Sequence, residues 1–248
     1  MKVILPSTPM RKKPNEFSNL ETECLFGESV EILDNFSDWL YCKLKTDSYC
    51  GWVNKIALGH LEECNYKVIS KRTFLFQHMD IKSYCFNYIP LAGQLTVKKI
   101  TDNWAAIMMP KRKELAYTPT KHIAKLGSNI RDWVSVAEKL IGTPYKWGGR
   151  DSLGIDCSAL LQISYQAYGQ NINRNTKDQV EITKNVINDI NDLHRGCVVF
   201  WKGHVGIMVD KLNCIHANAF HMETVIEPLE EIINRNKNLP IIKMMDFN

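Results

Sequence analysis

The stretch that most constrains the fold runs from Thr143 to Gly169, because it joins a glycine-rich turn to a helical pattern. Its first half carries a proline and three glycines, which is turn chemistry. Its second half carries leucines and tyrosines at the three-and-four spacing of one helix face. Asp156 is a favoured N-cap residue, so we expect a helix that begins at Cys157 and is stopped by Gly169.

A cysteine at the first position of a helix is a candidate nucleophile. The sulfur of Cys157 meets the positive end of the helix dipole and the unpaired amides of the first turn. Both favour the thiolate, which is the form that attacks a carbonyl. Flexible glycines just upstream let a substrate chain approach closely. The sequence therefore predicts an ionised nucleophile at Cys157.

Two histidines are candidates for the base that such a nucleophile needs. His204 and His216 lie in adjacent predicted strands, and a hairpin centred on Asp210 pairs them directly, with Cβ atoms ~5 Å apart. One ring can then fix the tautomer of the other. Isolated cysteines are more often small buried hydrophobes, and a lone strand histidine is more often structural. The prediction that Cys157 faces this hairpin therefore depends on three features occurring together: the glycine-rich turn, the capped helix that begins with Cys157, and the paired histidines.

A zinc site is the alternative use of these side chains. Cys197, His204, Cys214 and His216 are the four candidate ligands. Their spacings match no common zinc pattern. We therefore expect no metal and no other cofactor.

Composition excludes several classes of function. The chain has 248 residues, and 31 basic against 27 acidic side chains leave a charge of +4, too mild to indicate nucleic acid or a membrane surface as partner. Its N-terminal apolar run, residues 3–5, is shorter than a signal-peptide core. The eight cysteines form no C-x-x-C pair, so we expect reduced thiols and a cytoplasmic protein. No obligate protein partner is evident.

The chain divides into four predicted segments. Residues 1–16 are polar and contain prolines, which predicts an extended arm. Short strands separated by turn residues predict two small barrels, at 17–62 and 63–125. Residues 126–248 show helical patterns first and strands afterwards, which indicates an α+β domain with an antiparallel sheet. Within it, 176–179 has the form of a capping box and predicts a helix running through Ile182.

Residues 130–248 resemble the NlpC-type cell-wall peptidases, a branch of the papain-like cysteine peptidases. The motifs that match are TPYKWGGRDSLGIDCSALL, DLHRGCVVFWKGHVGIMV and CIHAN, in the family's order. The two barrels ahead of them look like bacterial SH3-like domains. The resemblance implies a papain-like C-terminal catalytic domain with Cys157 as nucleophile, His204 as base and His216 as the residue that orients it. One departure is Cys197, where such proteins often carry aspartate.

With two SH3-like barrels ahead of the peptidase motifs, the chain resembles the subgroup of this family that trims free murein peptides in cell-wall recycling. The resemblance implies cleavage of the γ-D-glutamyl–diamino acid bond in peptides with an unblocked N-terminal L-Ala. In that group a tyrosine from the first barrel leans over the cleft, and the turn DSYCGWV puts Tyr49 in that role. Without the resemblance, Tyr49 is simply a loop aromatic.

Three further side chains are candidates for substrate binding. The carboxylate of Asp156 suits the substrate ammonium, although a plain N-cap explains this residue equally well. Ser158 and Thr176 suit the α-carboxylate of D-Glu, and both also have capping explanations.

Two other functions stay open on the sequence. One is an endopeptidase or amidase that acts on intact peptidoglycan, which requires export and an open cleft. The other is a non-catalytic protein that binds wall peptides through its barrels. The trio of Cys157, His204 and His216 argues against the second of these.

Overall fold

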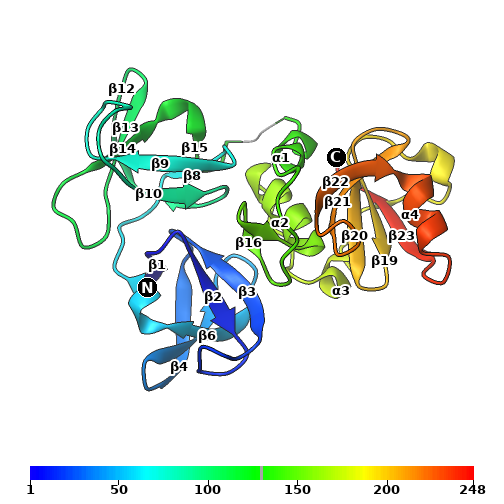
Figure 1. The fold of residues 1–248 in the computed structure, drawn as a ribbon, viewed down its shortest axis with the longest axis horizontal. Coiled ribbons are helices and arrows are strands. Elements are labelled where there is room, and N and C mark those ends of the chain that lie inside the picture. The colour runs from blue at the N-terminus through cyan, green and yellow to red at the C-terminus, as the bar shows by residue number, and fades with distance from the viewer. Residues whose placement is uncertain (129–130) are drawn as a thin grey trace. The chain divides into compact units, whose positions relative to one another are not determined.

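The computed structural model of the chain describes residues 1–128 and 131–248. Their contacts divide into two units. The N-terminal unit comprises residues 1–128 together with Arg150–Ser152, and the C-terminal unit comprises 131–149 and 153–248 (Figure 1). Strands dominate the first unit, and helices packed on a sheet make up the second, so the predicted α+β class is confirmed.

The first half of the N-terminal unit is a small β-structure. Five strands form one sheet in the order β3-β2-β6-β5-β4, and β1 pairs with β7. The elements are β1 (Lys2–Val3), β2 (Ser7–Arg11), β3 (Leu20–Leu25), β4 (Val30–Phe36), β5 (Trp39–Leu44), β6 (Cys50–Asn54), η1 (Lys55–Ala57) and β7 (Leu58–Gly59).

The predicted N-terminal arm is wrong, because β1 and β2 are part of this β-structure. Strand β2 pairs with β3 along its length and with β6 at Arg11. Thr8 and Met10 point into the core, while Pro9 between them faces outward in the alternating pattern. The sequence pattern did not indicate this strand, because it is short and polar and contains a proline, which is uncommon inside strands.

The second half of the N-terminal unit is also a small β-structure, built from a five-stranded and a three-stranded sheet. Their orders are β10-β9-β14-β13-β12 and β11-β8-β15. The elements are β8 (Tyr66–Val68), β9 (Arg72–Phe76), β10 (Cys85–Pro90), β11 (Gln94–Leu95), β12 (Val97–Thr101), β13 (Trp104–Ile107), β14 (Ala116–Pro119), η2 (Thr120–His122) and β15 (Ile123–Lys125).

A buried ion pair lies within the N-terminal unit. Strand β16 (Arg150–Asp151) supplies the Arg150 guanidinium, which is fully buried and donates two hydrogen bonds of 3.0 Å to the Glu28 carboxylate. The backbone N–H of Arg150 donates to Glu23 Oε2 at 2.9 Å. A buried guanidinium is tolerated because its charge is matched in this way.

The C-terminal unit is built on a six-stranded antiparallel sheet in the order β18-β23-β19-β20-β21-β22. Helices α1 and α2 lie on one side of it, and α4 lies on the other (Figure 1). The elements are α1 (Val134–Glu138), β17 (Gly154–Ile155), α2 (Cys157–Ala167), α3 (Thr176–Gln179), β18 (Asn185–Val186), η3 (Ile190–Asp192), β19 (Cys197–Trp201), β20 (His204–Met208), β21 (Asn213–Asn218), β22 (Glu223–Pro228), α4 (Leu229–Arg235) and β23 (Ile241–Asp246).

Helix α2 is the centre of this unit. It contacts α1, β20 and β21, and nearly all of its side chains are buried, although the sequence indicated one apolar face. It begins at Cys157 as predicted, and Gly169 follows its C-cap with φ +92°, the left-handed conformation that ends a helix. No helix in the described residues is long and apolar enough to cross a membrane.

The expectation for α3 is wrong in two respects. The helix ends at Gln179 and does not run through Ile182, and its N-cap is Asn175, whose side chain makes no capping hydrogen bond. Gln179 turns inward and donates to the carbonyl oxygens of Ser158 and Asn173. The apparent capping box therefore reflects side chains that serve tertiary contacts.

Candidate active site

Local capping places Cys157 at the start of α2. Asp156 is the N-cap, with an extended backbone, and its Oδ1 accepts from the backbone N–H of Ala159 at 2.8 Å. Its carbonyl accepts from the N–H of Leu160 at 2.9 Å, which closes the first turn. The Cys157 side chain is buried, with only 6% of the residue exposed. The sulfur therefore lies where the sequence predicted, at a helix N-terminus.

The expected thiolate is wrong for this resting structure. Burial and the neighbouring Asp156 carboxylate raise the pKa of Cys157 to about 11. The backbone N–H of Val205, the Thr176 hydroxyl and the Arg174 guanidinium lower this pKa, but not enough to offset the first two effects. Desolvation disfavours the charged form more strongly than the helix end favours it. The sulfur is therefore a neutral thiol at neutral pH.

The Asp156 carboxylate accepts five hydrogen bonds inside the C-terminal unit. Its Oδ1 accepts from Ala159, from the Ser158 hydroxyl at 3.1 Å and from Arg174 Nη1 at 2.9 Å. Its Oδ2 accepts from the N–H of Gly148 at 2.9 Å and from Arg174 Nη2 at 2.7 Å. Sequence reasoning missed Arg174, since nothing local marks a cation 18 residues away as a partner. The role of Asp156 toward a substrate ammonium stays a prediction.

The other predicted substrate-binding residues fall into two places. Ser158 and Thr176 are both close to the nucleophile: the Ser158 hydroxyl also receives Arg174 Nη1 at 2.7 Å, and the Thr176 hydroxyl hydrogen-bonds the Cys157 sulfur. Tyr49 belongs to the N-terminal unit, where its hydroxyl donates to a Glu21 carboxylate oxygen at 3.1 Å. Substrate contacts by any of the three stay predictions.

The two histidines meet, but in a different register from the predicted one. Ile207 pairs with Ile215, which puts Gly206 opposite His216 and moves the centre of the hairpin one residue beyond Asp210. The imidazoles are therefore diagonal neighbours on the same face of the sheet, still within reach of one another. His204 Nε2 lies 2.8 Å from His216 Nδ1.

A carboxylate continues the row of rings. His216 Nε2 lies 2.7 Å from Glu227 Oε1, and Arg235 binds the same carboxylate through both terminal nitrogens. Burial raises the pKa of Glu227, but hydrogen bonds from Arg235, His216 and His221 bring it down to about 2. Sequence reasoning missed Glu227, because only the register of β22 brings it beside His216.

Burial keeps both imidazoles neutral. It lowers the pKa of His204 to about 3, with His216 and Arg235 acting in the same direction and Glu227 opposing them. The pKa of His216 is also lowered by burial, against the effect of Glu227. The protons can then be assigned from the hydrogen bonds.

The carboxylate sets the tautomer of the whole row. Glu227 can only accept, so His216 carries its proton on Nε2, and the contact of Asn218 Nδ2 with that nitrogen at 3.1 Å is the weaker one. His216 Nδ1 is then an acceptor, and His204 Nε2 donates to it. This leaves the lone pair on His204 Nδ1, which is the arrangement that a base requires.

Tyr145 is a second residue that sequence reasoning missed. Burial, together with Cys157 and Asp156, raises the pKa of its hydroxyl to about 12. The phenol therefore stays protonated and is a donor near the sulfur. Its signal was present in the TPYKWGG motif, where the glycines drew attention away from it.

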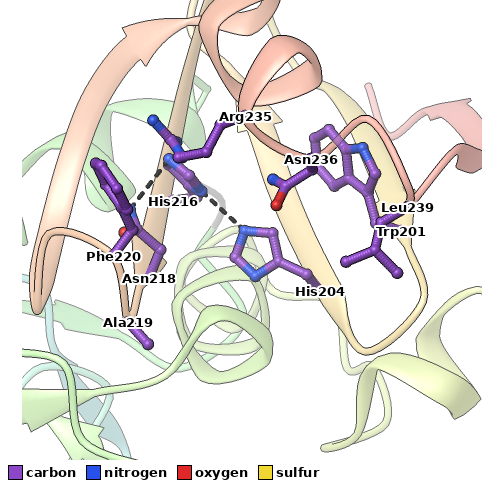
Figure 2. A pocket seen from close by; sticks show the side chains of 9 residues that line it. All are labelled: Trp201, His204, His216, Asn218, Ala219, Phe220, Arg235, Asn236 and Leu239. Carbon is purple, nitrogen blue, oxygen red and sulfur yellow. Dashed lines mark hydrogen bonds between the residues drawn. The ribbon is translucent and has the colours of Figure 1, made fainter.

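A pocket opens on the histidine side of the site. Figure 2 shows His204 and His216 along its floor, with Asn236 beside His204 and Arg235 above His216. It encloses about 630 Å³, part of it open to solvent. The remaining lining residues are Trp201, Asn218, Ala219, Phe220 and Leu239.

One cluster among the described residues has metal-ligand chemistry. The ligand atoms of His194, Cys197 and Asp246 lie within 4.8 Å of one another. The alternative zinc set of the sequence is not assembled, because Cys197 contacts His194, and the imidazole nitrogens of His204 and His216 bind one another.

Comparisons with known proteins match both units. Residues 142–238 match the NlpC/P60 family, and residues 10–58 match the bacterial dipeptidyl-peptidase Sh3 domain. Dipeptidyl-peptidase 6 of Lysinibacillus sphaericus is 23% identical over 92% of this chain and 91% of its own. The gamma-D-glutamyl-L-lysine dipeptidyl-peptidase of Bacillus cereus is 23% identical over 90% of this chain and 76% of its own. A crystal structure of an NlpC/P60 family protein from Bacillus cereus has a TM-score of 0.83 at 16% identity, covering 99% of this chain and 98% of that one.

Proposed function

We propose that this chain, which belongs to the NlpC/P60 family of cysteine peptidases and carries a bacterial dipeptidyl-peptidase SH3 domain, cleaves the γ-D-glutamyl–diamino acid bond of free murein peptides. The peptides have an unblocked N-terminal L-Ala, and L-Ala-γ-D-Glu is released. The observation that carries the proposal is the row from His204 through His216 to Glu227, beside a cysteine that leads a helix. The name of the Bacillus cereus relative, a gamma-D-glutamyl-L-lysine dipeptidyl-peptidase, supports the choice of bond.

The reaction begins from two neutral groups. When the substrate carbonyl reaches the sulfur, His204 Nδ1 takes the thiol proton and the sulfur attacks the γ-carbonyl carbon of D-Glu. Ionising a thiol with a pKa of about 11 costs less free energy in this step than it does in the resting enzyme. The reason is that the imidazolium and the developing oxyanion form together, and the site stabilises both charges. Glu227 stabilises the imidazolium through His216.

The oxyanion is stabilised by donors around the start of α2. First-turn amides point toward the sulfur end of the helix, and the protonated Tyr145 phenol is a further donor there. Such a donor contributes ~3–4 kcal/mol to transition-state stabilisation in other enzymes. His204 then gives its proton to the departing amine, and afterwards activates a water that hydrolyses the thioester.

The free N-terminus of the substrate is the second part of the proposal. Asp156 is the carboxylate nearest in sequence to the nucleophile, and an ammonium that it accepts shares it with Arg174. Ser158 and Thr176 provide hydroxyls for the D-Glu carboxylate. Tyr49 limits the length of the peptide at its amino end in this proposal.

The proposed location is the cytoplasm. All eight cysteines are free thiols in the structure, which suits a reducing compartment. Fractionation of cells that express the protein tests this, since recovery outside the cytoplasm contradicts it.

The central experiment compares two forms of one peptide. L-Ala-γ-D-Glu-diaminopimelate should release L-Ala-γ-D-Glu, and its N-acetylated form should resist. Equal turnover of both contradicts recognition of the amine. Release of soluble fragments from purified sacculi, at a rate similar to that on the free peptide, contradicts the preference for free peptides and favours action on intact wall.

A further inference from the structure

The pocket lined by Trp201 and the two histidines lies beside His204. His204 must protonate the departing amine, so the residue that carries this amine is next to the imidazole. The pocket is lined by His204 and His216 and by no residue of α2 or α3, where the nucleophile and the proposed acyl-side contacts lie. In the proposed function, on which this inference rests, the departing residue is the diamino acid.

The walls of the pocket suit a long side chain that ends in a charged group. Trp201, Phe220 and Leu239 provide apolar surface for a methylene stem. Asn236 has its side-chain amide beside His204 (Figure 2). Such a combination of apolar walls and a few polar groups is typical of small-molecule subsites.

The charge of the pocket determines which charged group at the end of the bound side chain is favoured. The lining includes no aspartate or glutamate, and Arg235 is its one permanent charge, since both histidines are neutral. The carboxylate partner of Arg235, Glu227, is not part of the lining and has only 12% of its side chain exposed. A guanidinium has five N–H groups, and Glu227 accepts from one on each terminal nitrogen. Donors therefore remain for a second carboxylate.

Arg235 is also held in position. Its guanidinium stacks on the Phe220 ring at 4.3 Å, and α4 ends at this residue. The next residues, Asn236 and Lys237, continue away from the helix, and Lys237 is exposed without lining the pocket. A rigid, half-buried guanidinium favours a carboxylate and opposes an ammonium on its own.

We propose that this pocket is the subsite for the departing diamino acid, and that Arg235 makes the enzyme prefer diaminopimelate to lysine at this position. The two side chains differ at one carbon: the carbon bearing the terminal ammonium carries a carboxylate in diaminopimelate and none in lysine. Arg235 binds this carboxylate, while the carbonyl oxygen of Asn236 is placed to accept from the ammonium. Lysine presents a lone ammonium to the guanidinium.

The test compares kcat/KM for L-Ala-γ-D-Glu-diaminopimelate and L-Ala-γ-D-Glu-L-lysine. A charge-assisted hydrogen bond corresponds to a preference of about 10-fold to 100-fold for the first peptide. Arg235→Gln should bring the ratio close to one, chiefly by raising KM for the diaminopimelate peptide, and Arg235→Lys should keep part of the preference. Lys237→Gln removes the same charge from an exposed neighbour and should leave the ratio unchanged.

The ratio separates this role from support of the catalytic row. Loss of Arg235 also disturbs Glu227, but that effect lowers kcat for both peptides equally. A wild-type ratio of one or below, or a ratio that Arg235→Gln does not change, overturns the proposal.

A binding measurement keeps the two proposals distinguishable. Saturation-transfer NMR on the Cys157→Ala protein should detect meso-diaminopimelate more strongly than L-lysine, and Arg235→Gln should remove the difference. If neither peptide is cleaved but this difference is found, the proposed function fails and the subsite stands. If the peptides are cleaved and no difference is found, the subsite fails alone.

Discussion

The C-terminal unit contains two carboxylate–arginine pairs. Asp156 and Arg174 lie beside Cys157, and Glu227 and Arg235 lie beside His216. The first pair is almost completely buried, with 2% of the arginine and 8% of the aspartate side chain exposed. The second is partly open, with 23% and 12% exposed. The same chemical pair therefore meets two different environments.

The difference separates a pair that supports the fold from a pair that acts on the two imidazole rings. Asp156 caps α2 and joins it to Gly148 and Arg174, and its charge raises the pKa of the nearby thiol. Glu227 caps no helix, and its charge raises the pKa of His204 and fixes the tautomer of His216. One carboxylate opposes ionisation of the Cys157 thiol, and the other favours protonation of the His204 ring.

The largest effect is expected from removing either reacting group. Cys157→Ala and His204→Ala should each lower kcat by on the order of 10⁴-fold to 10⁶-fold, and the double variant should be no slower than the single ones, because the two side chains act as a unit. Peptide turnover measured by chromatography tests this, with thermal unfolding as the check on folding. Cleavage by Cys157→Ala at the wild-type rate contradicts the assigned nucleophile.

The next effect distinguishes Glu227 from an ordinary surface carboxylate. Glu227→Gln should lower kcat by roughly 100-fold to 10,000-fold, because an amide can donate to His216 Nε2 and reverse the tautomers of both rings. His204 Nδ1 then carries a proton and cannot accept one from the thiol. Glu230→Gln, an exposed change on α4, is the matched control and should leave kcat unchanged. A similar kcat for the two variants shows that the tautomer of His216 is not set by Glu227.

Stability should respond in the opposite order. Asp156→Asn leaves the Arg174 guanidinium buried without its counter-charge, which typically costs ~3–5 kcal/mol of the free energy of unfolding. Glu227→Gln leaves a guanidinium that is 23% exposed and can be partly solvated, so its cost should be smaller than that of Asp156→Asn. Urea unfolding of the C-terminal unit, followed by tryptophan fluorescence, measures both. Equal losses in the two variants contradict the distinction between the pairs.

The sequence predicted those parts of this site that local signals specify. Capping by Asp156 fixed the start of α2, and the glycine that follows its C-cap fixed the end. Strand patterns after the helical ones predicted the antiparallel sheet and the adjacent strands β20 and β21 that carry the two histidines. Each of these signals lies within a few residues of the structure that it determines.

The remainder depends on contacts that no local pattern contains. The hairpin between β20 and β21 is shifted because Asp210 Oδ1 accepts from the N–H groups of Leu212 and Asn213, which makes the turn longer than a symmetric one centred on Asp210. Arg174 and Glu227 reach the site only through tertiary packing. The ionisation state of Cys157 was mispredicted for the same reason, since burial by neighbouring elements decided it.

The fall of activity at acid pH should reflect the pKa of His204, the imidazole that Glu227 acts on. Burial lowers the pKa of His204 to about 3, so its neutral, active form persists well below pH 6.5, the ordinary value for imidazole. We expect kcat/KM to lack an acid limb near pH 6.5. The unfolded chain binds protons at these histidines below pH 6.5 while the folded chain resists them, so stability falls as pH falls from 6.5 toward 3. An activity profile that drops with a midpoint at 6.5 contradicts the neutral, buried base.

The smallest effect is a change in the reactivity of the Cys157 thiol. Here the substitution should raise a rate, whereas the substitutions above lower kcat or stability. Alkylation of wild-type Cys157 by iodoacetamide should accelerate with pH up to about 11, the value to which burial and Asp156 raise its pKa. Asp156→Asn removes a charge that opposes the thiolate and keeps Arg174, which favours it, so this variant should be alkylated faster than wild type at pH 8 although its fold is less stable. Glu230→Gln, the exposed change on α4, keeps the Asp156 charge and should leave the alkylation rate unchanged. Mass spectrometry of the labelled peptide, below the unfolding temperature of each variant, gives the rates. Slower alkylation of Asp156→Asn than of wild type shows that Asp156 acts on the sulfur by some route other than its charge.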